Sequence, residues 1–391
     1  MDMPRIADPY LLTPGPLTTS PATKEAMLRD WGSWDGDFRA MTAALRQGLI
    51  ALLGPRAEGF DCVPMQGSGS YLVEAMLGSF VPRDGKVLVL ANGAYGKRAA
   101  QTLRQMGRAL TVIDKGDYLP PRGPEVAEAL AADPAITHVL AIHCETSSGI
   151  LNPLAEIAAA TEAAGRKLLI DSMSAFGAIP VEPGQIRFAA MVSSANKCIE
   201  GVPGFGFVLA PRDEISAAEG NSLSLSLDVH AQWRAMEANG QWRFTPPTHV
   251  VAAFLEALRQ HEAEGGVAAR GARYTANRDL LVAGMRDLGF ETLLPDPWLS
   301  PIIVTFFSPA DPAFDFNRFY DALKGRGFII YPGKLTEAES FRIGCIGQID
   351  SAVMGEVLSA ISVTLSEMGV ASGAPSPDVL AQSRRIQEVL A

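Results

Sequence analysis

The sequence has few basic residues for its length. Its 33 Lys and Arg residues are outnumbered by 43 Asp and Glu, which leaves a formal net charge of -10. A surface of that sign repels polyanions, so nucleic acid and acidic membranes are not expected as partners. An anionic substrate would need a local pocket of Arg, Lys and backbone N–H groups.

Cysteines, histidines and long apolar runs are also scarce. The four cysteines show no CxxC spacing and are interpreted as small core residues, and the five histidines form no ligand cluster. No apolar run approaches the roughly 18 residues of a membrane span. The N-terminal MDMPRIADPYLLTPGP lacks the basic flank and apolar stretch of a signal peptide. We therefore expect a cytoplasmic protein that binds no metal.

What the sequence does contain is a strong alternation of strand and helix patterns. Apolar residues make up 48% of the 391 residues, enough for a large core and, at this length, for two domains. Between residues 59 and 209, β-branched runs alternate with amphipathic segments, which predicts parallel βαβ units. The expected strands are DCVPM, KVLVLA, LTVID, THVLAIH, KLLIDS, AAMVSS and GFGFVLA. We predict an α/β fold with a large doubly wound domain around a mainly parallel seven-stranded sheet.

The pattern changes after two long helices predicted at 251–264 and 266–288. Strand and helix patterns in SPIIVTFF, FDFNRFYDALKGRG, FIIYPG and SFRIGCIG, followed by a helix at 351–368, predict a small α+β domain. We expect an N-terminal arm at 1–20, a large domain at 21–265, a small C-terminal domain at 266–370 and a tail at 371–391.

A glycine-rich turn follows the first predicted strand, at a position where open α/β sheets bind ligands. In Gln66-Gly67-Ser68-Gly69-Ser70, backbone N–H groups at a helix start can face an anion, and two hydroxyls add donors. The alternative is a plain tight turn. Neither G-x-G-x-x-G nor the P-loop pattern occurs in this segment, which weakens dinucleotide and P-loop interpretations.

Three charged residues at other strand ends complete a possible site. Asp171 ends the strand KLLIDS and either reaches the rim of the sheet or serves a turn. Lys197 alone among the eight lysines follows an apolar strand in a loop of small residues, where desolvation would lower its pKa; a solvated lysine is the alternative. Arg342 either forms a buried ion pair or binds an anion. Together, these parts suit pyridoxal phosphate and an anionic amine.

These residues lie in motifs by which the sequence resembles the fold-type I pyridoxal-phosphate aminotransferases of class V. Over residues 8–370 it is similar to the 2-aminoethylphosphonate:pyruvate aminotransferase family. The shared stretches are LLTPGPLTTSPATKEAMLRDWGSWD, QGSGS, NGAYGKR, HCETSSGILNP, DSMSAFG, SSANKCIEGVPGFGFV, SLSLDVHAQWR, RFTPPTHVV, IIYPGKL and FRIGCIG. The resemblance implies a homodimer with shared active sites that transfers the amino group of 2-aminoethylphosphonate to pyruvate, giving phosphonoacetaldehyde and L-alanine in phosphonate degradation.

The resemblance also implies roles for the matching residues. Lys197 and Asp171 would be catalytic: Lys197 forms the internal aldimine, and Asp171 pairs with the pyridine nitrogen. Arg342 would bind the substrate anion. The other cofactor-binding residues would be Ser68, Gly69 and Ser70 at the phosphate, Asn196 beside it, Thr245 from the neighbouring subunit, Tyr95 on the ring and Thr146 by the phenolic oxygen. Ser70 stands where relatives often have Thr, which keeps the hydroxyl.

Other functions share parts of this pattern. An alanine or serine:glyoxylate (or pyruvate) aminotransferase of the same class has the same Lys, Asp and Arg positions. A cysteine desulfurase needs a cysteine on a mobile loop, whereas Cys345 is expected within the strand FRIGC. An NAD-dependent Rossmann oxidoreductase also fits the alternating sheet, but it would lack a lysine that borohydride can trap. A noncatalytic phosphate-binding module would leave the converging strand-end residues unexplained.

Overall fold

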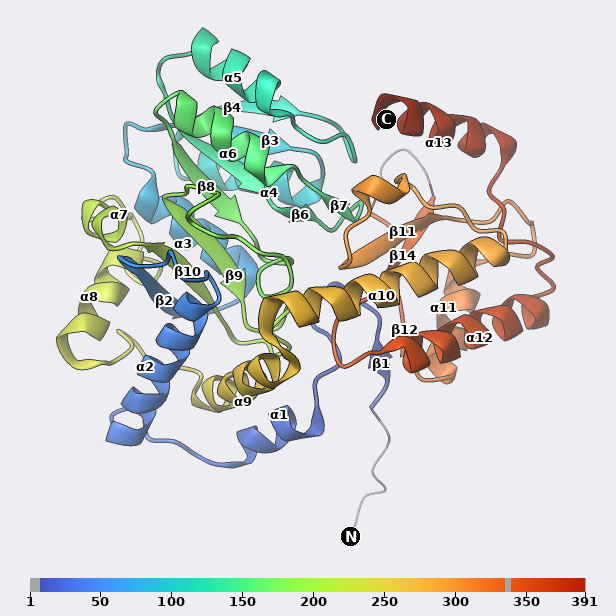
Figure 1. Ribbon diagram of the computed structural model, residues 1–391, viewed down its shortest axis with the longest axis horizontal. Coiled ribbons are helices and arrows are strands. Elements are labelled where there is room, and N and C mark those ends of the chain that lie inside the picture. The colour runs from blue at the N-terminus through green and yellow to red at the C-terminus, as the bar shows by residue number, and fades with distance from the viewer. Residues whose placement is uncertain (1–7, 335–338, 391) are drawn as a thin grey trace. The chain divides into compact units, whose positions relative to one another are not determined.

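The structure, a computed structural model, describes residues 8–334 and 339–390 (Figure 1). Its contacts divide the chain into two compact units. Of the described residues, the large unit comprises Thr19–Glu145 and Ile150–Gly271, and the small unit comprises 8–18, Thr146–Gly149, 272–334 and 339–390. The domain boundaries expected from the sequence stay predictions, and residues 1–7 of the expected arm lie outside the described residues.

The large unit is built on one seven-stranded sheet. In spatial order its strands are β2 (Phe60–Gln66), β10 (Phe205–Pro211), β9 (Ala190–Ser194), β8 (Lys167–Asp171), β5 (Ile136–Ile142), β3 (Lys86–Ala91) and β4 (Ala109–Asp114). Strand β10 runs antiparallel to both neighbours, and the other pairings are parallel. All seven strands coincide with the predicted runs, which confirms the mainly parallel sheet.

Helices cover both faces of this sheet (Figure 1). Side chains of β3 alternate between the two faces: Leu88 and Leu90 belong to one core cluster, Val87 and Val89 to the other. The helices of the large unit are α1 (Pro21–Glu25), α2 (Gly36–Ala51), α3 (Gly69–Phe80), α4 (Ala94–Gln105), α5 (Gly123–Ala132), α6 (Leu154–Ala163), α7 (Arg212–Ala217), α8 (Val229–Asn239) and α9 (Thr248–Glu264). Apolar residues of α2, α5, α6 and α9 pack on the first face, and those of α3, α4 and α7 on the second.

Because β2, β3, β5, β8 and β9 run in one direction, their carboxyl ends meet at one edge of the sheet. The Gly67–Ser70 turn follows β2, and Tyr95 lies in the first turn of the helix after β3. Asp171 ends β8, and Lys197 comes three residues after the end of β9. Backbone topology alone therefore gathers four of the expected site segments at this edge.

The small unit contains a three-stranded antiparallel sheet in the order β11 (Ile303–Phe307), β14 (Ser340–Gly344) and β13 (Tyr331–Pro332). Strand β1 (Tyr10–Leu11) pairs with β12 (Phe328–Ile329). The Phe341 ring lies 5.6–5.9 Å from the rings of Phe290, Phe306 and Phe319, and those of Phe290 and Phe306 lie 6.4 Å apart, so these side chains form an aromatic core. The helices are α11 (Phe316–Gly325), α12 (Ser351–Met368), α13 (Pro377–Leu390) and most of α10 (Gly266–Asp287). The predicted small α+β pattern is confirmed.

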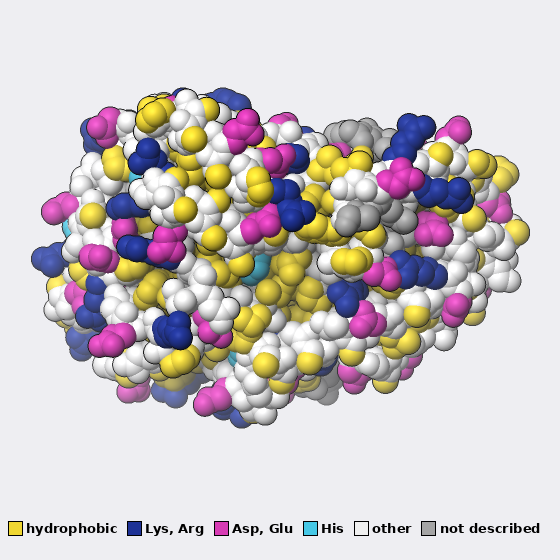
Figure 2. Space-filling view, turned by 45° about the horizontal axis from the view of Figure 1, so that its top comes forward, with side chains coloured by type: hydrophobic (Ala, Val, Ile, Leu, Met, Phe, Trp, Pro, Cys, Tyr) yellow, Lys and Arg dark blue, Asp and Glu magenta, His cyan; other side chains and the backbone are white. Residues whose placement is uncertain are grey.

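The surface carries charges of both signs in close mixture. On the face drawn in Figure 2, Lys and Arg side chains are interspersed with Asp and Glu side chains. Oppositely charged side chains on the surface form ion pairs; for example, Nε of Arg122 lies 2.6 Å from Oε1 of Glu156. Across residues 8–334 and 339–390, no helix is long and apolar enough to cross a membrane.

Candidate active site

The turn between β2 and α3 has the features of an anion cradle. Gly67 has a φ of 124°, a backbone conformation that L side chains rarely adopt, and Ser68 precedes the first residue of α3. A Cβ atom on Gly69 would lie 2.7 Å from Sδ of Met173, so a larger residue would displace the segment after β8. The first N–H groups of a helix have no partner within it. The turn therefore offers donors to an anion at the positive end of α3.

Asp171 is a buried carboxylate at the same edge, with 6% of its surface exposed. Burial raises its pKa from 3.8 to about 6, and the charge of Glu145 adds to this, whereas the Met173 N–H bond and the charges of Lys197 and Arg98 oppose it. At pH 7 the carboxyl is therefore mostly ionised. A buried anion of this kind would be stabilised by a cation bound beside it.

Lys197 follows the buried residues that end β9 and is itself half-buried. Lys197 and Asp171 both belong to the carboxyl edge of the sheet, and the positive charge of Lys197 favours the ionised form of Asp171. Other lysines have acidic partners: Lys86 lies 2.5 Å from Asp133, and Lys167 lies 2.6 Å from Glu214. Lys86 and Lys167 begin β3 and β8, at the opposite end of the sheet from Asp171.

Two site residues were missed from the sequence. Glu145, in the short strand β6 (Cys144–Glu145), is fully buried and accepts a 3.1 Å hydrogen bond from the N–H of Tyr95. Arg98 donates a 3.1 Å hydrogen bond to Oγ of Ser70, and its guanidinium lies 5.0 Å from the centre of the Tyr95 ring. The i, i+3 spacing of Tyr95 and Arg98 on α4 was the available signal.

His143 and Ser172 are a second pair that the sequence did not single out. The Nδ1 atom of His143 lies 3.0 Å from Oγ of Ser172, and the His143 N–H donates to the Asp171 carbonyl at 2.8 Å. Burial lowers the pKa of His143 to about 4, so its ring is neutral at physiological pH. These contacts tie the carboxyl ends of β5 and β8 together beside Asp171.

The remaining expected residues of the large unit are Asn196 and Thr245. The Oδ1 atom of Asn196 accepts a 3.1 Å hydrogen bond from Oγ of Ser194, which fixes the residue before Lys197. Thr245 is exposed in the segment between α8 and α9, next to the 45% exposed Phe244. An exposed position is compatible with contact to a second chain.

Arg342 and Thr146 belong to the small unit and contact each other. The guanidinium of Arg342 is fully buried: Nε and Nη2 donate to the Pro332 carbonyl at 3.0 and 2.9 Å, and Nη1 donates to the Thr146 carbonyl at 2.7 Å. It also lies 5.2 Å from the centre of the Tyr331 ring. Neutral carbonyls and an aromatic face thus hold this cation in a fixed orientation.

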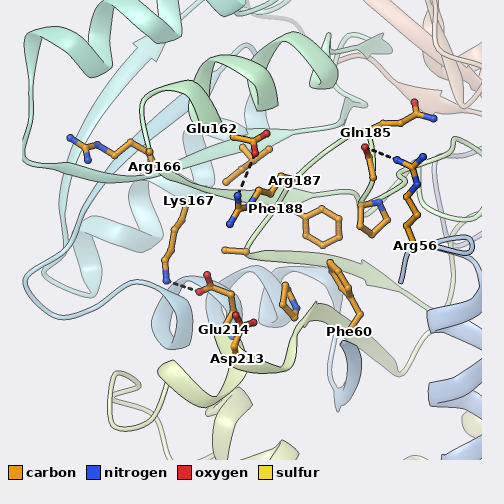
Figure 3. Close-up of a pocket in the computed structure, with 16 residues that line it drawn as sticks. Arg56, Phe60, Glu162, Arg166, Lys167, Gln185, Arg187, Phe188, Asp213 and Glu214 are labelled. Atoms are coloured by element: carbon orange, nitrogen blue, oxygen red, sulfur yellow. Dashed lines mark hydrogen bonds and ion pairs between the residues drawn. The ribbon is translucent and has the colours of Figure 1, made fainter. Parts of the chain in front are cut away.

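A separate cavity of ≈ 560 Å³ lies at the opposite edge of the large sheet (Figure 3). Its lining includes Phe60 and Lys167, which begin β2 and β8. Lys167 pairs with Glu214 at 2.6 Å and Arg187 with Glu162 at 3.4 Å, so these four charged groups of the lining already have protein partners. The strand-end chemistry lies elsewhere, and we assign this cavity no role in it.

Comparison with known proteins decides the family. Residues 66–313 match the family model described as Aminotransferase class-V. The chain belongs to this family. A 2-aminoethylphosphonate--pyruvate transaminase from Rhizobium meliloti (strain 1021) is 69% identical over 97% of this chain and 100% of its own length. A second protein of that name, from Paraburkholderia xenovorans (strain LB400), is 64% identical over 98% of this chain and 99% of its own.

Solved structures agree with the class V fold. An alanine--glyoxylate aminotransferase from Nostoc sp. superposes with a TM-score of 0.85 at 21% identity, covering 93% of this chain and 97% of its own. A pyridoxamine-pyruvate aminotransferase from Mesorhizobium loti gives 0.83 at 23% identity, covering 100% of both chains. The predicted fold is confirmed. Pyridoxal phosphate is the cofactor of this class V chain, and the bare Gly69 cradle and the buried Asp171 carboxylate suit its phosphate and its pyridinium.

Proposed function

We propose that this chain transfers the amino group of 2-aminoethylphosphonate to pyruvate, giving phosphonoacetaldehyde and L-alanine. The observation that carries the proposal is the 69% identity, across the whole length of the relative, to a 2-aminoethylphosphonate--pyruvate transaminase. The joint placement of Lys197 and Asp171 at one sheet edge supports it. The fully buried Cys345, whose thiol pKa burial raises to about 12, argues against a cysteine desulfurase.

The proposal gives each candidate site residue of the large unit a chemical role. Bound pyridoxal phosphate supplies an electron sink for the C–H bond next to the substrate nitrogen. The turn at Ser68, Gly69 and Ser70 binds the phosphate, and Asp171 keeps the pyridine nitrogen protonated. Lys197 holds the cofactor covalently and, once its amine is free, moves a proton as general base and acid. Tyr95 would stack on the ring, and Asn196 would lie beside the phosphate.

The proposal assigns Arg342 to the substrate anion and Thr146 to the phenolic oxygen of the cofactor. Arg342 contributes one hydrogen bond from each of its nitrogens to backbone carbonyls. A guanidinium is a planar group that carries five N–H donors. A planar fork can bind a phosphonate in one half of the reaction and a carboxylate in the other.

We also propose a cytoplasmic homodimer in which Thr245 completes the partner's phosphate site. Apolar side chains near this residue face solvent in the single chain: Leu225 is 70% exposed and Phe244 is 45% exposed. Arg243 joins the two segments, because it donates to the Leu225 carbonyl at 2.7 Å and lies 5.3 Å from the Phe244 ring. Exposed apolar residues of this size favour an interface.

The test combines a spectrum, a trapping reaction and a donor screen. The purified protein should show the absorption of bound pyridoxal phosphate, and borohydride should fix the cofactor to Lys197. Lys197→Ala should bind the cofactor without a covalent bond and lose transamination. Preference for alanine or serine with glyoxylate over 2-aminoethylphosphonate with pyruvate would overturn the substrate assignment. A borohydride adduct on Lys334 would overturn the assignment of Lys197 as the cofactor lysine. Full activity in a variant shown to be monomeric by sedimentation would contradict the shared site.

A further inference from the structure

The loop that carries Lys197 contains an unusual backbone conformation. Glu200 has a φ of 64°, and it is the one non-glycine residue with a positive φ in the described chain. Its N–H donates to the Lys197 carbonyl at 2.7 Å, and the N–H of Gly201 donates to the Ala195 carbonyl at 2.9 Å. Such a conformation persists where surrounding contacts hold it, and it is often found at functional sites.

Arg270, near the start of α10, makes several of the contacts that hold this loop. Arg270 is fully buried, and Nη1 donates to the Cys198 carbonyl at 2.5 Å and lies 3.5 Å from Oε1 of Glu200. Its Nε atom donates to Oε2 of Glu264 at 2.7 Å. One guanidinium therefore contacts the Cys198 carbonyl next to Lys197, the Glu200 carboxylate and the carboxylate of Glu264, the last residue of α9. A lysine could not make these contacts together, because its charge is a single point.

The corner between α9 and α10 also holds the segment after Asp171. Nε2 of His261 lies 2.6 Å from the Gly177 carbonyl, which requires a proton on that nitrogen. A Cβ atom on Gly271 would lie 2.3 Å from the Ala178 carbonyl oxygen, so the backbones touch there. Sγ of Cys198 donates to the Ser174 carbonyl at 3.1 Å. The two loops that follow Asp171 and Lys197 are thus packed on each other and on one helix corner.

We infer that Arg270 is a positioning residue for Lys197: by fixing the Cys198 carbonyl and Glu200, it sets where the Lys197 amine stands relative to Asp171. The inference rests on the proposed role of Lys197. Arg270 contacts the loop and not the reacting atoms, so its loss acts through geometry. A misplacement of about 1 Å can cost roughly 100-fold in rate, and we expect kcat to fall roughly 10- to 100-fold with little change in KM.

Arg46 provides a matched control in the same unit. Its Nε atom donates to the Cys62 carbonyl at 2.9 Å, and Nη2 donates to Asp61 and Glu237, both at 2.7 Å. It is thus also a guanidinium that joins a cysteine carbonyl to two carboxylates. Cys62 lies near the amino end of β2, away from the edge that carries Lys197. Arg46→Met should lower stability without affecting the lysine loop.

The experiment compares Arg270→Met, the double variant Arg270→Met/Glu200→Gln and Arg46→Met as full-length proteins. The double variant removes the uncompensated carboxylate that could prevent folding. Hydrogen exchange of peptides spanning 197–204 should be roughly 10-fold faster or more in both Arg270 variants, with and without cofactor, and unchanged in Arg46→Met. In the loaded enzyme, the pH midpoint of the cofactor absorption band should move in the Arg270 variants alone.

Two results overturn the inference. One is unchanged exchange at 197–204 together with an unchanged pH midpoint in a folded Arg270 variant. The other is equal acceleration at 197–204 in Arg46→Met, which would indicate general loosening of the unit. Failure of the proposed function is read separately, from the position of the borohydride adduct in the unaltered protein. An adduct elsewhere than Lys197 would leave the exchange result intact as a statement about the loop.

Discussion

Glu145 and Tyr95, 50 residues apart in the chain, are joined by a 3.1 Å hydrogen bond from the Tyr95 N–H to the buried Glu145 carboxylate. The same carboxylate oxygen lies 3.4 Å from the N–H of Gly96. An anion at the first turn of a helix stabilises that helix. Because Glu145 also raises the pKa of Asp171, one side chain both orients the start of α4 and sets the charge balance of the site.

Glu145→Gln should lower the pKa of Asp171 from about 6. The amide keeps an oxygen acceptor for the Tyr95 N–H but removes a like charge that disfavours the ionised form of Asp171. Carboxyl carbon NMR of the cofactor-free protein, with Asp171→Asn used to assign the signal, measures this pKa. An unchanged titration would show that the charge of Glu145 does not reach Asp171.

Asp171→Asn should stabilise the cofactor-free protein at pH 8 while it removes activity. In the folded chain the pKa of Asp171 is raised from 3.8 to about 6, so its stabilising contribution is present below pH 3.8 and is lost as the pH rises through 6. Ionisation of Asp171 thus lowers the free energy of unfolding by about 3 kcal/mol, and the Asn variant does not lose this stability because its amide does not ionise. Urea unfolding at pH 4 and pH 8 checks the difference, which should be small at pH 4. Equal stability of the two proteins at pH 8 would contradict the burial argument.

His143→Gln should reduce the loss of stability at acidic pH. Burial lowers the pKa of His143 from 6.5 to about 4, so the stability that it contributes is present above pH 6.5 and is lost as the pH falls through 4. The loss in the unaltered protein is up to about 3 kcal/mol. Gln can keep a hydrogen bond to Ser172 and does not titrate. His138, whose pKa burial also lowers to about 4, is present in both proteins, so their difference between pH 7 and pH 4 isolates His143. Parallel stability curves would refute the prediction.

Arg342→Lys should weaken 2-aminoethylphosphonate and pyruvate together. Loss of a charge-assisted, two-point contact costs about 1.5–3 kcal/mol, roughly 10- to 150-fold in affinity. Single-turnover measurements of each half of the reaction give the two affinities. Arg278→Lys is the control, because Arg278 also belongs to the small unit and donates to a backbone carbonyl, that of Leu299 at 2.9 Å. If both variants lower the melting temperature and neither changes substrate affinity, Arg342 is structural.

Much of the fold was predictable because its signals are local. Each strand of the large sheet is a short β-branched run between helix patterns, and β3 shows the period of two in its alternating Leu and Val residues. Parallel strands bring their carboxyl ends to one edge, so the Gly67–Ser70 turn, Asp171 and Lys197 could be grouped before any coordinates. The family motifs added what spacing could not, namely the proposed substrate.

The remaining features depend on contacts between segments that are distant in the chain. No local pattern indicates that Arg270 contacts the lysine loop, because Arg270 lies 70 residues after Glu200 and the two meet only in the folded chain. Burial, which depends on all neighbours, set the pKa values of Asp171 and His143. The sequence by itself therefore determined the order of the strands along the chain and the chemical types at their ends. Tertiary structure decided which side chains orient those groups and how strongly they hold their protons, because desolvation and hydrogen-bond geometry exist only once the chain has folded.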